Sequence, residues 1–512
     1  MSVSCDAATR GYPETFTEEF VRYCRAHHLP SQLFYELGEV LATIPRYIRL
    51  RPQYVKDFVM PAEDNTLAFE NATSWERCRI RDKIAASFGI SSASVEEVEW
   101  LPHPYCYAIP RGVAMCRAVM YERGIVSAMD AASMAAVVAL RPSHGDMVWD
   151  VCCSPGMKLS LIADAIGETG VAVGTDISLA RLFTARSVLK KHQTGNVCLF
   201  AADGTSFSLH GAAAVLDEKP SSQTRGRNGL TLWEERQLRR FQKRRVEASV
   251  GPATASSGVE EGKEIRVAFS TDPARERLCC VENKMSEHHG FDRVLVDAEC
   301  SHDGSLAHMF LNDATRRPFA TVKDALTPVS AGIDNAHRMW RLNLALQMDE
   351  TDVEFREELS TLLRLQLGLL QNGYAQLKPG GTLVYCTCSF TYQQNEFIVR
   401  ETVSRVNASN EVKQQYKGEA VICHPFAYTH ETVSSEVISP IVRLTDAQAT
   451  SLQQRLKMDA DPYGILRAGG EEINNAGGQS FTGVRFWPHT FATSFQFVAK
   501  IWKRPLSSLS VE

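Results

Sequence analysis

Short apolar runs alternate with helical patterns between residues 110 and 208, and this alternation constrains the fold more than any other feature of the chain. The runs predict strands at 148–152, 171–175 and 197–201, with helices at 159–166 and 179–190 between them. Strands that alternate with helices form a parallel sheet with right-handed crossovers. The sequence therefore predicts the α/β class, with a Rossmann-like sheet.

The same pattern resumes in the second half of the chain. Apolar runs predict strands at 294–296, 382–386 and 495–502, and 359–370 predicts a helix. We therefore expect one Rossmann-like domain built from 111–208 and 289–504. A smaller α+β region is predicted at 1–110.

Two stretches interrupt the pattern and are predicted to be insertions. Residues 209–288 are rich in Ser, Gly, Ala, Arg and Glu without strand periodicity, so we predict a long, flexible, partly basic insertion there. Its densest positive run has eight Lys or Arg against two Glu at 225–245. That run is interpreted either as a solvated helix or as an element that contacts phosphates. A second insertion is predicted at 311–352.

Composition excludes several other classes of protein. The 14 cysteines are scattered through 512 residues, and no paired C-x-x-C spacing indicates a structural metal. Residues 1–30 lack the pattern of a signal or transit peptide, and no apolar stretch approaches the roughly 18 residues of a membrane span. We expect an intracellular, soluble protein with reduced thiols, no metal and no membrane contact. A net charge of −5 gives no global nucleic-acid signature.

Three acidic residues stand at the ends of the first three predicted strands, where ligands bind in an open α/β sheet. They are Asp150, Asp176 and Asp203. Asp176 is placed to accept hydrogen bonds from ribose hydroxyls, and Asp203 to contact an adenine edge. The alternative is that these acids only cap the helices that follow them.

The turn after the first of these strands is rich in small residues and lies before a helix. Its residues Cys153, Ser154, Pro155 and Gly156 allow backbone to approach a ligand closely, and the helix points its amide groups there. Because the pattern is not G-x-G-x-x-G, a nicotinamide dinucleotide is disfavoured. S-adenosylmethionine, with a single adenosine and a sulfonium, fits better.

Two cysteines stand just beyond predicted strands. Cys300 follows an apolar run in D-A-E-C-S, and Cys388 follows another in C-T-C-S. Two thiols beside a cofactor site indicate a reaction through a covalent cysteine adduct. The thiols of Cys152, Cys153 and Cys386 are interpreted as packing groups.

Together these motifs resemble the Fmu/Sun (NSUN) family of RNA cytosine-5 methyltransferases. The resemblance covers most of the chain in the right order, apart from the two insertions. The matching segments are 46–50, 124–133, 150–158, 176–181, 202–204, 297–301, 365–366, 378–389, 394–396 and 491–500. The resemblance implies a class I methyltransferase fold, S-adenosylmethionine as the cofactor, and methylation of carbon 5 of cytosine in tRNA or rRNA.

The resemblance also implies roles for individual residues. Cys388 attacks carbon 6 of the cytosine, Cys300 assists release, and Asp297 hydrogen-bonds or protonates the base at ring nitrogen 3. The implied cofactor-binding residues are Cys153, Ser154, Pro155, Gly156, Lys158, Asp176, Arg181 and Asp203. Lys158 is expected either to orient acids in the site or to form a structural salt bridge. RNA contacts are expected from Arg46, Arg49, Arg51, Arg181 and 236–245, with a solvated surface role as the alternative for each arginine.

The chain departs from the family pattern beside Cys300. Glu299 replaces the usual Pro, and His302-Asp-Gly-Ser305 stands where many members have a glycine-rich turn. A carboxylate next to Cys300 is expected to raise the pKa of its thiol, which favours Cys388 as the nucleophile. The alternatives to an active RNA methyltransferase are a catalytically weak RNA-binding scaffold and a methyltransferase that acts on DNA or protein.

Overall fold

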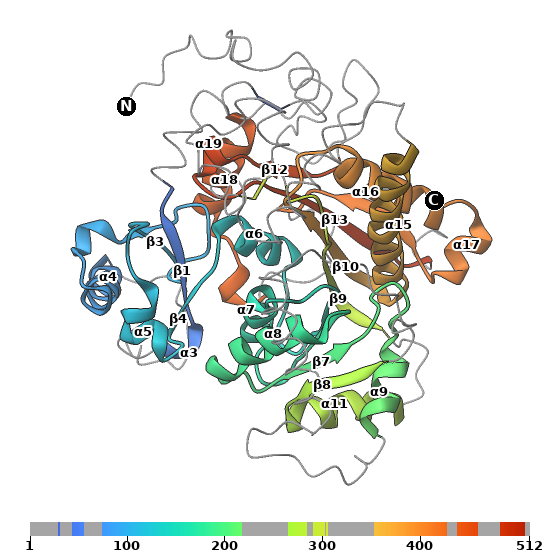
Figure 1. Cartoon of the computed structure of the whole chain (residues 1–512), viewed down its shortest axis with the longest axis horizontal. Coiled ribbons are helices and arrows are strands. Elements are labelled where there is room, and N and C mark those ends of the chain that lie inside the picture. The colour runs from blue at the N-terminus through green and yellow to red at the C-terminus, as the bar shows by residue number, and fades with distance from the viewer. Residues whose placement is uncertain are drawn as a thin grey trace, which may run out of the picture.

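A computed structural model describes most of the chain as two adjoining lobes, each built on its own sheet (Figure 1). One sheet has nine strands and the other has four. The described residues are 29–30, 44–55, 74–217, 265–283, 290–302, 304–305, 353–426, 438–458 and 482–506. The predicted Rossmann-like sheet with a smaller N-terminal α+β unit is confirmed.

Five neighbouring parallel strands form the centre of the large sheet. In sheet order they are β7 (Val197–Ala201), β6 (Val171–Asp176), β5 (Met147–Asp150), β9 (Phe291–Asp297) and β10 (Leu377–Thr387). The chain order runs outward from β5 in one direction and from β9 in the other, so the topological switch point lies between these two strands. Each of the five had been predicted, with bounds that coincide for β7 and differ by up to five residues for the others.

Antiparallel strands complete both edges of this sheet. β13 (Gln496–Arg504) lies between β10 and β11 (Glu419–Cys423), and β12 (Val484–Phe486) also pairs with β13. At the opposite edge, β8 (Arg266–Ser270) pairs with β7. β13 confirms the strand predicted at 495–502.

Helices cover both faces of the large sheet, which explains why its strands are apolar on both sides. One face carries α6 (Ala131–Leu140), α7 (Met157–Ile166) and α8 (Leu179–Lys191). The other carries α9 (Leu209–Asp217), α11 (Asp272–Asn283), α15 (Val353–Ala375) and α16 (Ile398–Val406) (Figure 1). Neighbouring residues of β5 accordingly pack on opposite faces of the sheet. Val148 lies in the core under α6, α7 and α8, and Trp149 lies in the core under α9, α11, α15 and α16.

The remaining helical elements are short or lie at the periphery. They are α3 (Pro52–Val55), α4 (Ser74–Phe88), η3 (Ser92–Ser94), η4 (Met115–Arg117), α5 (Val119–Glu122), η6 (Gln393–Phe397), α17 (Asn410–Gln415), η7 (Pro440–Val442), α18 (Asp446–Met458) and α19 (Pro488–Phe491). Within the described part of the chain, no helix combines the length and apolar character that crossing a membrane requires.

The small sheet is antiparallel and contains β2 (Glu96–Glu97), β3 (Cys106–Ile109), β1 (Arg46–Leu50) and β4 (Val126–Ala128), in that order. The last of these strands comes after the predicted boundary at residue 110. The N-terminal unit therefore continues to at least residue 128 before the chain enters the large domain at α6.

The RNA contacts predicted for Arg49 and Arg51 are wrong. Both side chains are 1% exposed, and their guanidiniums lie 2.5 and 2.7 Å from the carboxylate of Asp164 on α7. A buried cation requires a buried counter-charge, so these pairs fix the small sheet against the large domain. Arg46 is only partly buried and donates to the Val113 carbonyl at 2.9 Å.

The predicted insertion at 209–288 is contradicted at both of its ends. α9 packs in the core at the start, and β8 and α11 extend the sheet and cover it near the end. The basic run at 225–245 and the second predicted insertion at 311–352 lie outside the described residues.

Candidate active site

The carboxyl ends of the parallel strands meet along one edge of the large sheet, and most predicted site residues lie there. Asp150 ends β5 and Asp176 ends β6, whereas Asp297 ends β9. Cys388 follows β10 directly, and Cys386 is in register with Asp297. The cofactor-type acids and the thiols therefore share one edge, on opposite sides of the switch point.

Gly156 shapes the turn between β5 and α7. Its φ of 97° lies in the left-handed region, and a Cβ at this position would lie 3.0 Å from the Cα of Ala185. Glycine alone combines that conformation with so close an approach. The turn leaves the first amide groups of α7 directed toward the sheet edge, where they favour a polar ligand group.

Asp150 is buried below this turn. The residue is 1% exposed, and neither carboxylate oxygen accepts a well-formed hydrogen bond. Burial, with the nearby carboxylates of Asp297 and Asp176, raises the pKa of Asp150 to about 8. The buried carboxyl group of Asp150 can therefore still form hydrogen bonds with a ligand.

Asp176 and Asp203 cap the turns that follow them, and not the helices as the alternative interpretation had expected, because Ser178 is the N-cap of α8 and α9 begins only at Leu209. Asp176 Oδ1 accepts from the Ser178 amide and Asp203 Oδ1 from the Thr205 amide, each at 2.9 Å. The other oxygen of Asp176 lies 3.5 Å from Arg181 Nε, and burial raises the pKa of Asp176. Each cap uses one carboxylate oxygen, so capping does not exclude a ligand contact through the other.

Ile177 is a candidate site residue that the sequence did not reveal. It follows Asp176 directly and is 68% exposed. An exposed apolar side chain beside a strand-end acid can contact the flat face of a ligand. The signal in the sequence was weak, because single exposed apolar residues are common on protein surfaces.

Lys158 lies between the cofactor turn and the thiols. Its Nζ is 2.7 Å from Asp297 Oδ2 and 3.3 Å from Ser133 Oγ. Although burial opposes it, the Asp297 carboxylate raises the pKa of Lys158, so the side chain stays charged. Cys386 Sγ donates to Asp297 Oδ1 at 3.4 Å. The ion pair with Asp297 is compatible with both roles predicted for Lys158, and Cys386 contacts the same acid.

The thiols of Cys300 and Cys388 meet, and His302 joins them. The two sulfurs are 3.5 Å apart, and His302 Nδ1 lies 3.1 Å from Cys388 Sγ and 3.5 Å from Cys300 Sγ. Cys300 is 1% exposed, whereas Cys388 and His302 are partly exposed. We refer to these three side chains as the thiol–imidazole cluster.

The expected effect of Glu299 on Cys300 is wrong. Hydrogen bonding with the Cys388 thiol, together with His302, holds the pKa of Cys300 well below its ordinary value despite burial. The Glu299 carboxylate lies 3.5 Å from Arg181 Nη1, which reduces the influence of its charge. Proximity in sequence to an acid therefore does not determine the ionisation of this thiol.

A buried polar network joins the two cysteine loops. Ser301 Oγ donates to Ser389 Oγ at 2.9 Å, so the residues next to the two thiols are in contact. Gln394 accepts from the Ser301 amide at 3.0 Å and donates to Ser301 Oγ at 2.8 Å. Asn395 Nδ2 donates to the Ser389 carbonyl at 2.7 Å. The segment 394–396, known from sequence only as a matching motif, thus positions both thiols.

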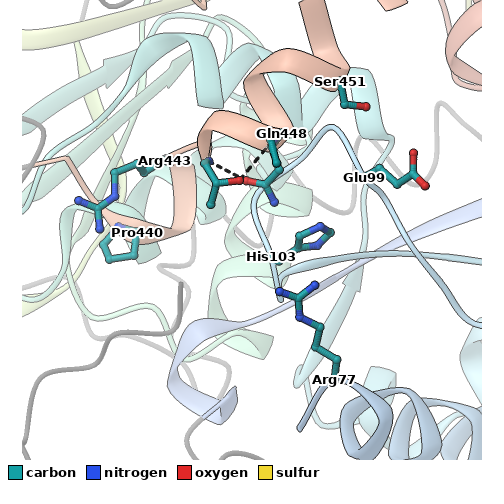
Figure 2. A pocket seen from close by; sticks show the side chains of 9 residues that line it. Arg77, Glu99, His103, Pro440, Arg443, Gln448 and Ser451 are labelled. Carbon is teal, nitrogen blue, oxygen red and sulfur yellow. Dashed lines mark hydrogen bonds between the residues drawn. The ribbon is translucent and has the colours of Figure 1, made fainter. Parts of the chain in front are cut away.

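A separate cavity of about 300 Å³ lies between loops of the small sheet and α18. Figure 2 shows side chains that line it, which include Arg77, Glu99, His103, Arg443 and Gln448. None of its lining residues is a thiol or a predicted site residue, so this cavity is distinct from the sheet-edge site.

The thiol–imidazole cluster also meets the distance condition for a metal site. The ligand atoms of Cys300, His302 and Cys388 all lie within 4.8 Å of one another. Thiolate and imidazole are ligands that zinc prefers. The absence of a metal therefore stays a prediction.

The strand order and the edge residues define a Rossmann-like methyltransferase fold with two thiols at the site. A family model described as 16S rRNA methyltransferase RsmB/F matches residues 347–429. The 5-cytosine rRNA methyltransferase NSUN4 of Mus musculus is 26% identical over 289 residues, 56% of this chain and 47% of that protein. The 28S rRNA (cytosine-C(5))-methyltransferase of Mus musculus is 23% identical over 287 residues, 56% of this chain and 22% of that protein.

The chain thus spans less than half the length of these curated relatives. A methyltransferase homologue of known structure from Pyrococcus horikoshii is 16% identical with a TM-score of 0.45, covering 95% of each chain. The family model over residues 347–429 and these relatives support the resemblance of the chain to the Fmu/Sun family.

Proposed function

We propose that this protein methylates carbon 5 of cytosine in RNA, with S-adenosylmethionine as the methyl donor and a covalent cysteine–cytosine adduct as the intermediate. The observation that carries the proposal is the contact of Cys300 with Cys388, 3.5 Å apart at the sheet edge that also holds the cofactor-type acids. The matched relatives are named as rRNA methyltransferases, which makes rRNA the first substrate to test and tRNA the second.

The residues on β5 and β6 fit the cofactor. The amide groups after Gly156 and the buried carboxyl of Asp150 offer polar contacts, and Asp176 offers a carboxylate oxygen to the ribose hydroxyls. Ile177 offers an apolar face to the adenine, and Asp203 a polar contact at its edge. When bound, S-adenosylmethionine supplies an electrophilic methyl group.

The thiols overcome the low nucleophilicity of the cytosine ring. Carbon 5 of cytosine is a weak nucleophile, and a bond from Cys388 Sγ to carbon 6 moves an electron pair toward carbon 5. A proton passes from Asp297, which lies 2.7 Å from Lys158 Nζ, to ring nitrogen 3 as this bond forms, and it returns to Asp297 when the bond to sulfur breaks. After methylation, Cys300 takes the proton from carbon 5, the C5–C6 double bond forms again, and the bond from carbon 6 to sulfur breaks.

Exposure and the position of His302 support this division of roles. Cys388 is partly exposed, so an unpaired or flipped base can reach its sulfur, whereas Cys300 is 1% exposed. His302 Nδ1 lies 3.5 Å from Cys300 Sγ and can stabilise a thiolate there, which then accepts the carbon-5 proton. The family resemblance implied the same roles, with Cys388 as the nucleophile and Cys300 in release. Their support is now the exposure of the two thiols rather than the charge of Glu299.

A direct test is transfer of labelled methyl groups to separate pools of rRNA, tRNA, DNA and protein. We expect label in RNA, recovered as 5-methylcytosine after digestion. Binding of S-adenosylmethionine without label in any pool would favour the RNA-binding scaffold instead. Label in DNA or in protein would support the third alternative.

We expect Asp176→Asn to weaken binding of S-adenosylmethionine about 10- to 100-fold, because hydrogen bonds to a charged group contribute about 1.5–3 kcal/mol. Isothermal titration calorimetry measures the affinity without any RNA. Asp272→Asn is the matched control, because Asp272 begins the helix after β8, at the far edge of the sheet. Equal affinities of the two variants would contradict the proposed ribose contact.

A further inference from the structure

His302 has a backbone conformation that residues with a side chain rarely adopt. Its φ is 58°, in the left-handed region, which costs about 1–2 kcal/mol for a residue with a Cβ. Glycine adopts it without that cost, and asparagine is also common there. Strained backbone positions cluster at functional sites, so the contacts of the His302 imidazole are relevant to function.

The turn that carries His302 is fixed to the loop of Cys388. The Gly304 amide donates to the Cys388 carbonyl at 2.9 Å, and the Ser305 amide donates to the His302 carbonyl at 3.1 Å. A Cβ at Gly304 would lie 2.7 Å from the Cys388 carbonyl oxygen, so a larger residue would separate the two loops. The imidazole is therefore held against the sulfurs.

We propose that His302 is a catalytic base that takes the proton of the Cys388 thiol, so that the cluster contains a thiolate–imidazolium pair. The S–H bond of Cys388 breaks, a bond from the proton to His302 Nδ1 forms, and the electron pair stays on sulfur. The two atoms are 3.1 Å apart, within reach of direct transfer. Nδ1 is also 3.5 Å from Cys300 Sγ, so one imidazolium can balance a thiolate on either sulfur.

Other ionisable groups on β9, on β10 and on the loop after β9 have partners or surroundings of their own. On β9, Asp297 is paired with Lys158, and on the loop after it Glu299 faces Arg181. On β10, burial raises the pKa of the Tyr385 hydroxyl, which keeps it neutral. The Cys388 sulfur is within hydrogen-bonding distance of both His302 and Cys300.

The benefit of this pair for methyl transfer rests on the proposed function, but ionisation of the thiol needs neither cofactor nor RNA. Its test is therefore the alkylation rate of Cys388 by iodoacetamide between pH 5.5 and 9, with each cysteine quantified by mass spectrometry. Cys116 is exposed and supplies an internal reference in every sample. A chelator is included because the cluster could bind a thiophilic metal.

We expect wild-type Cys388 to remain reactive at pH 6 and the variants His302→Gly and His302→Asn to react about 10-fold or more slowly there. Without the base, the thiol returns toward an ordinary pKa of about 8.5, where each unit of pKa changes the thiolate fraction about 10-fold at low pH. Near pH 9 the rates of all forms should converge. Both substitutions suit the left-handed backbone, so neither is expected to unfold the turn.

Lys417→Gly is the matched control, because Lys417 also has a φ of 58° and lies after α17, outside the site. It relieves the same strain without changing the thiols. A pH profile of Cys388 that is unchanged in both His302 variants, or that follows Cys116 in the wild-type protein, would overturn the proposal. If His302 variants shift the profile but no RNA is ever methylated, the proposed function fails and the role of His302 stands.

Discussion

Replacing Cys300 by alanine is expected to trap RNA on the protein, whereas replacing Cys388 is expected to prevent any adduct. Without the Cys300 thiolate, the proton on carbon 5 is not removed, and the bond between Cys388 Sγ and carbon 6 persists. Methyl transfer at steady state should fall at least about 10³-fold in both variants. A labelled RNA that migrates with the protein in a denaturing gel measures the adduct directly.

The activated nucleophile should survive in the Cys300→Ala variant. His302 Nδ1 contacts Cys388 Sγ at 3.1 Å without any involvement of Cys300, so the first half of the reaction can still proceed. Because Cys388 can attack the base without Cys300, the variant is expected to form the covalent adduct rather than to show no reaction with RNA. A double variant, His302→Gly with Cys300→Ala, should form the adduct more slowly at pH 6 than Cys300→Ala alone.

Cys116→Ala controls for the loss of a thiol, because Cys116 is exposed and lies outside the sheet-edge site. It should methylate RNA at the wild-type rate and accumulate no adduct. An adduct confined to Cys388→Ala would reverse the two roles. Turnover that persists in either single variant would exclude the two-thiol mechanism.

The parallel strands could be predicted because burial on both faces gives each of them a short, continuous apolar run. The bounds predicted for β7 coincide with Val197–Ala201, all five residues of which are buried or nearly so. The ends of such strands also showed where the site lies, since parallel strands bring their carboxyl ends to one edge. The acids and both thiols of the site were found in this way.

The burial of Arg49 and Arg51 could not be predicted by the same reasoning. Alternating basic and apolar residues are typical of a half-exposed strand, and nothing local distinguishes that case from a strand with a buried acid opposite it. The acid is Asp164, more than a hundred positions away. β8 was missed for a related reason, because this edge strand has only one fully buried residue, Ala268, and so lacks an apolar run.

The role of His302 was equally hidden, because a departure from a glycine-rich turn says nothing about where an imidazole points. The contact with Cys388 spans 86 positions and depends on the φ of His302 and on the hydrogen bond from Gly304. The network around Gln394 also joins segments about 90 positions apart. Chemistry that depends on two distant loops follows from the tertiary structure rather than from either motif alone.

Glu396→Gln is expected to destabilise the protein by about 3–5 kcal/mol, because it leaves a buried guanidinium without its counter-charge. Glu396 and Arg485 are each 3% exposed, and Arg485 donates to both carboxylate oxygens, with distances of 2.9 to 3.0 Å. Glu396 follows Gln394 and Asn395, so loss of the pair should also loosen the network that positions the thiols. Urea unfolding, followed by fluorescence, measures the shift in midpoint.

Two comparisons separate the buried charge from other consequences of the substitution. The double variant Glu396→Leu with Arg485→Met removes both charges and should lose much less stability than Glu396→Gln, since no uncompensated charge remains. Glu401→Gln breaks the Arg405–Glu401 pair on the next helix, whose side chains are 52% and 32% exposed, and should cost at most about 0.5 kcal/mol. If Glu396→Gln were no more harmful than Glu401→Gln, the buried pair would not stabilise this segment, and the position of the thiols would depend on the hydrogen bonds of Gln394 and Asn395 alone.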